Sequence, residues 1–421
     1  MSIVQAIKYT DPSSCKGTLP SDSNHWLLVF ALIVFLFGNT FFKTTLYTIA
    51  LVFFLAFSVF NLRSAFRLAI SAVGLFPLVL IFLASYLWSF VPHLTLDAIR
   101  SQIVFVLFAL LISSKYRFDG FSSSLLRAVF FIVGIVSFYC LVFWNAAYSS
   151  AGLAAFYNHK NTLGGTMALC ALVLFNAPYR KRFHLYAGML AIAILAATLS
   201  KTSIALFVVC TALLKVVDVL SDCNTKKHSY VTLKEVAASS LVVIALLLLV
   251  ALVVFRDEFI SIVWDNLPKT ALTGRGMLWL VVIQQIRSYS LLGIGPGVFW
   301  QGGGVSEIAQ TTLYLKDPYW VQRMGSADGG YIDLVASIGM LGLAFFLLTA
   351  IDFYRRLRIH WQRPDSRLLF VLVTFVLLHA ITESTILHST NIFWLIYLLC
   401  YFRVCGYSVF LSEPPRKEVI I

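Results

Sequence analysis

Long apolar stretches recur along almost the whole of this 421-residue chain, and they constrain its fold more than any other feature. Hydrophobic residues make up 60% of the sequence and charged residues only 12%. An average soluble domain has about 25% charged residues, so this chain carries too little charge to cover a globular surface of its size. The composition therefore excludes a soluble globular enzyme and a disordered scaffold, and it predicts a membrane protein.

A helix needs about 20 mainly apolar residues to cross the hydrocarbon core of a bilayer. By this measure the sequence predicts an all-α polytopic membrane protein with about twelve transmembrane helices. The first and fourth predicted spans are short, so either can be interfacial or broken. The predicted spans are residues 26–38, 44–60, 70–90, 102–113, 125–144, 162–178, 185–200, 203–220, 236–255, 331–353, 368–387 and 392–410.

The predicted spans divide the chain into five regions. Residues 1–25 form a cytoplasmic tail, residues 26–255 hold the first nine helices, and residues 256–330 form a large extracytoplasmic loop with short amphipathic helices. Residues 331–410 hold the last three helices, and residues 411–421 form a second cytoplasmic tail. Loops as long as the one at 256–330 are uncommon unless they are functional.

The distribution of lysine and arginine tests the direction of these spans, because cytoplasmic loops carry an excess of basic residues. With both termini inside, 22 of the 32 basic residues lie in inner segments and 32 − 22 = 10 lie outside. The 19 acidic residues divide into 10 inside and 9 outside. Membrane topology therefore accounts for the net charge of +13, and no continuous basic face indicates nucleic-acid binding.

Cysteine usage predicts neither a disulfide framework nor a metal site. None of the seven cysteines lies in the large outer loop, and there is no CxxC pair. No outer cluster has metal-ligand spacing, and neither a phosphate-loop lysine nor a nucleophile elbow is present. We expect no metal and no cofactor.

The large outer loop contains three recognisable patterns. Residues 276–289 alternate apolar and polar side chains as an amphipathic helix on a membrane surface does. The glycines of 293–297 predict a tight turn, because no strand precedes them as a dinucleotide fingerprint requires. The aromatic residues Trp300, Tyr314, Tyr319 and Trp320 fit a belt at the lipid interface or a platform on which sugars stack.

Four basic residues on the outer side are exceptions to the inner excess: Lys160, Lys201, Arg275 and Arg323. Each alone can be an interfacial anchor, since a charge at a helix end reaches water by snorkelling. If they converge, they form a site for an anion such as a pyrophosphate, which arginine grips with two hydrogen bonds and lysine attracts as a point charge.

Candidate general bases on the outer side are His159, Asp328 and Asp333. Asp328 can instead cap a helix, and His159 can be a neutral hydrogen-bonding partner. Asp333 is predicted one turn inside a span, where a carboxylate is costly enough to indicate function. His93, Glu383 and His388 are more distant prospects.

The same residues resemble the O-antigen ligase and Wzy-type polymerase superfamily of bacterial envelope glycan assembly, and most closely its ExoQ-type exopolysaccharide polymerases. The resemblance runs from about residue 155 to residue 350. It rests on five motifs in order: His159-Lys-Asn-x-x-Gly164, Ser200-Lys-Thr202, Gly274-Arg-x-x-Leu-Trp279, Leu292-Gly-x-Gly295 with Phe299-Trp300, and Gly330-Tyr-Ile-Asp333 with Ile338-Gly-Met-Leu-Gly342.

This resemblance implies a glycosyltransferase of the bacterial inner membrane that acts on the extracytoplasmic face. Its substrate would be a glycan on undecaprenyl pyrophosphate, passed to a sugar hydroxyl without a metal. Membrane lipids and an acceptor glycan or lipid are further expected partners, and a complex with a flippase or chain-length regulator is a further expectation.

The resemblance also implies roles for individual residues. Lys160, Lys201 and Arg275 are expected to bind the pyrophosphate, and we add Arg323 to them because it is an outer basic residue. Asp328, His159 and Arg275 are expected to be catalytic, and we assign glycan contacts to Asn161, Trp300 and Tyr331. Two positions depart from the family pattern: Asp328-Gly329 replaces the usual His-Asn, and Lys201 replaces an arginine.

Three other functions remain open at this level. The nearest is ligation of the glycan to lipid A-core or another acceptor. Another is a flippase or transporter, although transporters usually show internal repeats and midplane charges, which this sequence lacks. The third is a noncatalytic partner in an envelope complex.

Overall fold

The computed structural model describes residues 29, 32–33, 62–115, 120–149, 152–157, 159–178, 180–225, 275–301, 325–389 and 391–410. At a few positions within helices, among them Arg275, it describes the backbone alone. The predicted tails, the second and ninth predicted spans and most of the first lie outside this part. So do Arg323 and the aromatic residues of 314–320.

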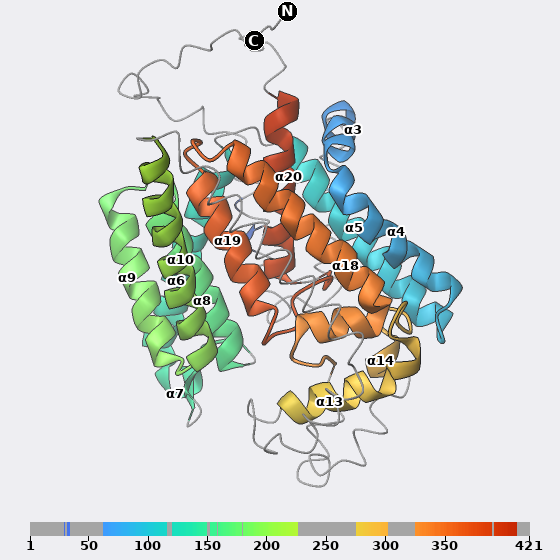
Figure 1. Ribbon diagram of the computed structural model, residues 1–421. Helices are drawn as coiled ribbons and strands as arrows, with labels where there is room; N and C mark the ends of the chain where they lie inside the picture. The colour runs from blue at the N-terminus through green and yellow to red at the C-terminus, as the bar shows by residue number, and fades with distance from the viewer. Residues whose placement is uncertain are drawn as a thin grey trace, which may run out of the picture.

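The described chain is almost entirely helical (Figure 1). Its sheet structure is one antiparallel pair of two-residue strands. In chain order the elements are α3 (Leu62–Ser71), η5 (Val73–Leu75), α4 (Phe76–Ala84), η6 (Ser85–Leu87), α5 (Pro92–Lys115), α6 (Gly120–Val142), α7 (Trp144–Ala147), β1 (Tyr148–Ser149), β2 (Gly152–Leu153), α8 (Lys160–Asn176), α9 (Arg182–Ala197), α10 (Lys201–Thr225), α13 (Arg275–Gln285), η8 (Arg287–Tyr289), α14 (Val298–Gln301), α18 (Gly330–Ile359), α19 (Ser366–His379) and α20 (Ile392–Phe410).

Three of the described helices are long and apolar enough to cross a membrane, at Pro92–Ser114, Gly120–Val142 and Gly330–Ile359. The segments Leu62–Ser71 and Val73–Leu87 pass the same test together, but they are bent by 68°. Other apolar helices in the described part, such as α9 and α19, are shorter. The predicted number of about twelve spans is therefore not confirmed, although the helical fold class is.

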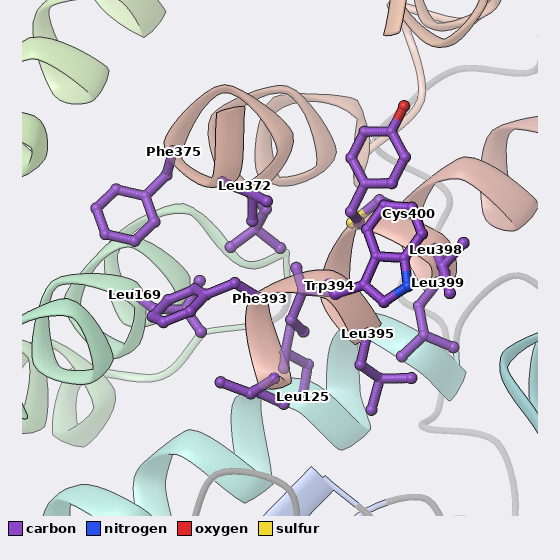
Figure 2. Packing of buried hydrophobic residues seen from close by; sticks show 14 of the residues in the cluster. Leu125, Leu169, Leu372, Phe375, Phe393, Trp394, Leu395, Leu398, Leu399 and Cys400 are labelled. Atoms are coloured by element: carbon purple, nitrogen blue, oxygen red, sulfur yellow. The ribbon is translucent and has the colours of Figure 1, made fainter. Parts of the chain in front are cut away.

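Helix α20 lies at the centre of the apolar core and is buried along most of its length. Figure 2 shows Phe393, Trp394 and Leu395 of this helix among apolar side chains of three other helices, which include Leu125 of α6, Leu169 of α8 and both Leu372 and Phe375 of α19. Several helices pack around α20. Residues that lie far apart in the sequence are therefore close together at the ends of these helices.

Helix α18 is broken, which the apolar pattern at residues 331–353 did not predict. Its backbone leaves the helical conformation at Ile338 and at Gly339, where φ is 72°. The preceding loop satisfies backbone groups that the break leaves without a helical partner, because the amides of Ile294 and Gly295 donate to carbonyls of 336 and 337 at 3.0 Å each. Non-helical backbone within a membrane protein is tolerated where protein satisfies it in this way.

The glycines of 293–297 form the predicted turn, and the structure adds its partner. Gly293 has a φ of 70°, and a Cβ there would lie 2.6 Å from the carbonyl carbon of Ser337. Only glycine permits both this backbone conformation and this approach. The turn at 293–297 therefore packs against the backbone of α18 at its break.

Several predicted inner basic residues gather at one end of the bundle, where α18 ends and α19 begins. Arg367 pairs with Asp218 of α10 at 2.7 Å. Arg403 of α20 pairs with the buried Asp365 at 2.9 Å. The helices α7, α13 and α14 lie at the opposite end, at the bottom of Figure 1. We call this second end the outer end, after the side of the membrane that the sequence predicts for it.

Candidate functional site

The predicted His-Lys-Asn segment forms the start of helix α8 at the outer end. His159 is the N-cap residue, and its Nδ1 accepts from the backbone N–H of Asn161 at 3.2 Å. Capping satisfies one of the backbone donors that a helix start leaves without an intrahelical partner. In this conformation His159 acts as the hydrogen-bonding partner that was the alternative to a base, while its imidazole stays exposed.

Helix α10 begins with the second predicted lysine. Lys201 is its first residue, and its side chain is exposed. No carboxylate of the described chain forms an ion pair with it. The turn before it is tight, because Leu199 has a φ of 54° and the amide of Ser200 donates to the Thr198 hydroxyl at 3.2 Å. This places an available cation at a positive helix end.

A side-chain bridge joins the starts of α8 and α10. The Oγ of Ser200 lies 3.0 Å from Oδ1 of Asn161, to which it donates. The Nδ2 of Asn161 in turn donates to Oε1 of Glu383 at 3.1 Å. We call this chain of three residues the Asn161 bridge. It brings Glu383, which the sequence ranked as a distant prospect, into the lysine-bearing site.

Two adjacent glycines explain how these helices approach so closely. A Cβ on Gly164 would lie 2.9 Å from Cβ of Ser200, and a Cβ on Gly165 would lie 2.7 Å from Nε2 of His379. Any larger residue would push α8 away from α10 or α19. The Gly164 of the predicted motif is therefore a packing residue that permits the Asn161 bridge.

Asp333 gathers four hydrogen bonds on its carboxylate. The backbone N–H of Ala327 donates to both oxygens at 3.0 and 3.2 Å, and Nε1 of Trp300 donates at 2.9 Å. The Ser384 hydroxyl donates to Oδ2. Because Asp333 precedes the break at Ile338, it lies on the short first segment of α18. A carboxylate engaged by three donors holds these segments together, which argues against the role of general base.

Asp328 does not cap α18, contrary to the alternative that the sequence allowed. The N-cap residue is Gly329, and no side chain caps this helix. Asp328 has a φ of 49°, a left-handed conformation that aspartate tolerates better than most residues. Gly329 fits because a Cβ there would lie 2.8 Å from the indole nitrogen of Trp279. Asp328 thus remains a candidate base on a tightly constrained turn.

The three predicted glycan contacts have polar groups that are bonded within the protein. The amide group of Asn161 is engaged in its bridge, and the Trp300 indole donates to Asp333. The Tyr331 hydroxyl donates to the carbonyl of Leu377 at 2.9 Å. These groups therefore first serve the architecture of the site.

Helix α13 occupies the place predicted for an amphipathic helix, but its apolar side faces protein. Leu278, Val281 and Val282 are buried, and they pack in a cluster with Phe299 and Ala327. The indole N–H of Trp279 donates to the Ala327 carbonyl at 2.9 Å. The prediction that these apolar residues lie on the membrane surface is therefore wrong. Arg275 is the first residue of α13.

Strained backbone is confined to this end of the described chain. The non-glycine residues with positive φ are Ala155, Leu199, Asp328 and Leu387. They precede His159, Lys201, the start of α18 and His388, respectively. Each such conformation costs about 1–3 kcal/mol and tends to occur where a function requires it. The strain makes the outer end a candidate functional region without reference to any sequence motif.

The remaining candidates contribute less to the site. His93 and His388 are exposed. Among the described residues no group of three or more His, Cys, Asp or Glu side chains is arranged to hold a metal ion.

Sequence reasoning missed the roles of Trp279 and Ser384. Ser384 accepts from the amide of Gly329 at 3.1 Å while it donates to Asp333. Its neighbour Glu383 bonds to Asn161. The loop after α19 therefore connects the α8–α10 half of the site with the half formed by α13, α14 and α18.

Comparison of the chain with family models and with curated proteins finds no match.

Proposed function

We propose that this protein is a membrane glycosyltransferase that polymerises oligosaccharide units carried on undecaprenyl pyrophosphate. The observation that carries the proposal is the pairing of two helix starts, each headed by a lysine. Lys160 begins α8 and Lys201 begins α10, and the adjacent residues Asn161 and Ser200 are hydrogen-bonded at 3.0 Å. The order of the five motifs supports the same function.

The electrostatics of this arrangement suit a pyrophosphate. A helix start carries about half a positive charge from its aligned peptide dipoles, and its backbone N–H groups favour anions. Two such ends with two lysines present positive charge to adjacent phosphate groups. Arg275, at the start of α13, is proposed as a third cation, which adds a bidentate grip.

In the proposed reaction a hydroxyl of the acceptor sugar attacks the anomeric carbon of the lipid-linked glycan. The bond between this carbon and the phosphate oxygen breaks, and its electron pair leaves with the pyrophosphate. Lys160, Lys201 and Arg275 stabilise the charge that develops there, the kind of interaction that most lowers a barrier. Asp328 takes the proton from the attacking hydroxyl.

The proposed location is the bacterial inner membrane, with both termini in the cytoplasm and the site on the extracytoplasmic face. Helices long and apolar enough to span a membrane support the membrane location. The inner excess of lysine and arginine supports the direction.

The direct test is to incubate the purified protein with a defined undecaprenyl-pyrophosphate oligosaccharide and to separate the lipid-linked products by length. Polymerisation predicts a ladder of longer lipid-linked chains. Transfer to lipid A-core without a ladder would make the protein a ligase, the nearest alternative. Movement of the lipid across liposomes without any transfer would make it a flippase and would refute the proposal.

A further inference from the structure

The Asn161 bridge has a role that the sequence assigned to no residue. We propose that Asn161 is a positioning residue, which sets the spacing of Lys160 and Lys201 through Ser200 and Glu383 instead of contacting the glycan. This inference rests on the proposed function, because the lysines are taken to bind the pyrophosphate. It gives Glu383 a role as the anchor of Asn161.

The hydrogen-bond geometry assigns both ends of the Asn161 amide to protein partners. Its Oδ1 accepts from Ser200 at 3.0 Å, and its Nδ2 donates to Glu383 at 3.1 Å. These distances are typical of well-formed hydrogen bonds. The partners lie 39 and 222 residues away in the sequence, so the bridge fixes three separate segments at once.

Each lysine is the immediate neighbour in sequence of a residue of the Asn161 bridge. Lys160 precedes Asn161, and Lys201 follows Ser200. Because consecutive Cα atoms are about 3.8 Å apart, the bridge limits how far the two lysine backbones can separate. Ser200 is itself held by a contact with the Ser203 hydroxyl at 3.0 Å and by its approach to Gly164. The distance between the two lysine backbones is therefore set by the packing of α8 against α10.

The bridge also places a carboxylate beside a site for anions. An unpartnered carboxylate there would oppose a pyrophosphate, whereas the donation from Asn161 partly offsets the negative charge of Glu383 and orients it. The adjacent Ser384 contacts Gly329 and Asp333. A shift of Glu383 would therefore be transmitted to the turn that carries Asp328.

An exchange of chemical groups tests this role. Asn161→Asp places a second carboxylate against Glu383, and repulsion should separate the pair. The double variant Asn161→Asp with Glu383→Gln restores one amide and one carboxylate in reversed order, with the total charge unchanged. Glu383→Gln alone keeps an oxygen that accepts from Asn161, so its effect should be small.

The expected result is a pattern in kcat, measured as lipid-linked chain extension. Asn161→Asp should lower kcat about 10- to 100-fold, because small displacements of binding groups have effects of this size. The double variant should recover to within about threefold of the wild type, a difference of less than 1 kcal/mol. The matched control is Asn176→Asp at the other end of α8, which should keep wild-type activity. Each protein is checked by gel filtration in detergent.

Three results would overturn the proposal. A double variant as inactive as Asn161→Asp would show that the exchange does not restore the function of the bridge. Loss of activity in Glu383→Gln alone would show that the carboxylate itself does chemistry. A rise in the KM for the acceptor sugar with kcat unchanged would return Asn161 to glycan binding.

Melting temperatures separate this inference from the proposed function. They are measured for the wild type, Asn161→Asp, Glu383→Gln and the double variant. If the bridge forms, Asn161→Asp lowers the melting temperature and Glu383→Gln restores it, whatever reaction the protein catalyses. Restoration of the melting temperature together with an inactive wild type would refute the proposed function and leave the bridge in place. Independent effects of the two substitutions on the melting temperature would refute the bridge.

Discussion

Polar side chains at the outer end are mostly engaged in hydrogen bonds to other segments. Asp333 is the clearest case, since its carboxylate accepts from Ala327, Trp300 and Ser384. Such a residue stabilises the geometry of a site without taking part in its chemistry. The basic group best placed for direct contact with the proposed substrate is Lys201, whose side chain is exposed.

Replacement of Asp333 by asparagine tests this reading. Asparagine keeps one acceptor oxygen but turns an N–H₂ group toward donors, so buried donors lose their partners. We expect Asp333→Asn to lower the free energy of unfolding in detergent by about 1–3 kcal/mol. The control is Asp218→Asn, which removes a partly exposed ion pair with Arg367 and should cost less than about 1 kcal/mol. Equal stability of Asp333→Asn and the wild type would contradict the structural role.

The lysines could be selected from sequence because they depart from a rule about membrane topology. The role of Asp333 could not, because its side-chain donors lie 33 and 51 residues away and no local pattern encodes such pairings. The sequence did flag it as unusual, for the reason that a carboxylate in an apolar span is costly. The sequence also made it a candidate base, but it could not reveal the donors that surround the carboxylate.

At the scale of elements, the contact between α8 and α10 brings the two lysine-bearing helix starts together. Gly164 is the residue that permits this contact, since a Cβ there would lie 2.9 Å from Cβ of Ser200. Backbone proximity through small residues is a common way for membrane helices to associate. The glycine of the motif therefore permits the helix contact that brings the two motif lysines close together.

Gly164→Ala should separate α8 from α10 and lower the rate of chain extension by about tenfold or more, since displaced catalytic groups lose rate steeply. The protein should still insert and fold. The control is Gly134→Ala in α6, where a Cβ would meet nothing within 4 Å; alanine favours a helix more than glycine does, so this change should be harmless. The comparison uses initial rates at equal amounts of folded protein, and unchanged rates in Gly164→Ala would contradict the packing argument.

The break in α18 shows what an apolar pattern cannot reveal. Residues 331–353 read as one uninterrupted span, and the helix does run through most of that range. The break at Ile338 and Gly339 depends on a positive φ and on amides supplied by 294 and 295. Hydropathy records none of these, so the helix was predicted correctly and its interruption was not.

At the scale of the whole molecule, two ion pairs between helix segments and the strained turns lie at opposite ends of the described chain. The ion pairs Arg367–Asp218 and Arg403–Asp365 mark one end, and the strained turns and the lysine-headed helices mark the other. The excess of inner basic residues in the sequence predicts this polarity. The helical fold class was thus accessible from composition, whereas the orientation in the membrane and the number of about twelve spans stay predictions.

Sidedness can be measured with cysteine labelling in a chain whose own cysteines have been replaced. We expect Asn145→Cys, in α7, to react with a membrane-impermeant maleimide added from the extracytoplasmic side. Arg355→Cys, near the end of α18, should react only from the cytoplasmic side. Both side chains are exposed, so accessibility itself is not limiting. Labelling of both positions from the same side would refute the proposed orientation.

The central claim is that the lysine-headed helix starts form the site of glycan transfer, and one pair of variants tests it most directly. Lys201 and Lys215 lie on the same helix, and both are exposed. Lys201→Ala should lower kcat for extension of the lipid-linked oligosaccharide about 10²- to 10³-fold, the usual effect of removing a group that stabilises transition-state charge. Lys215→Ala, about four turns further along α10, should match the wild type. Equal activity of the two variants would contradict the claim.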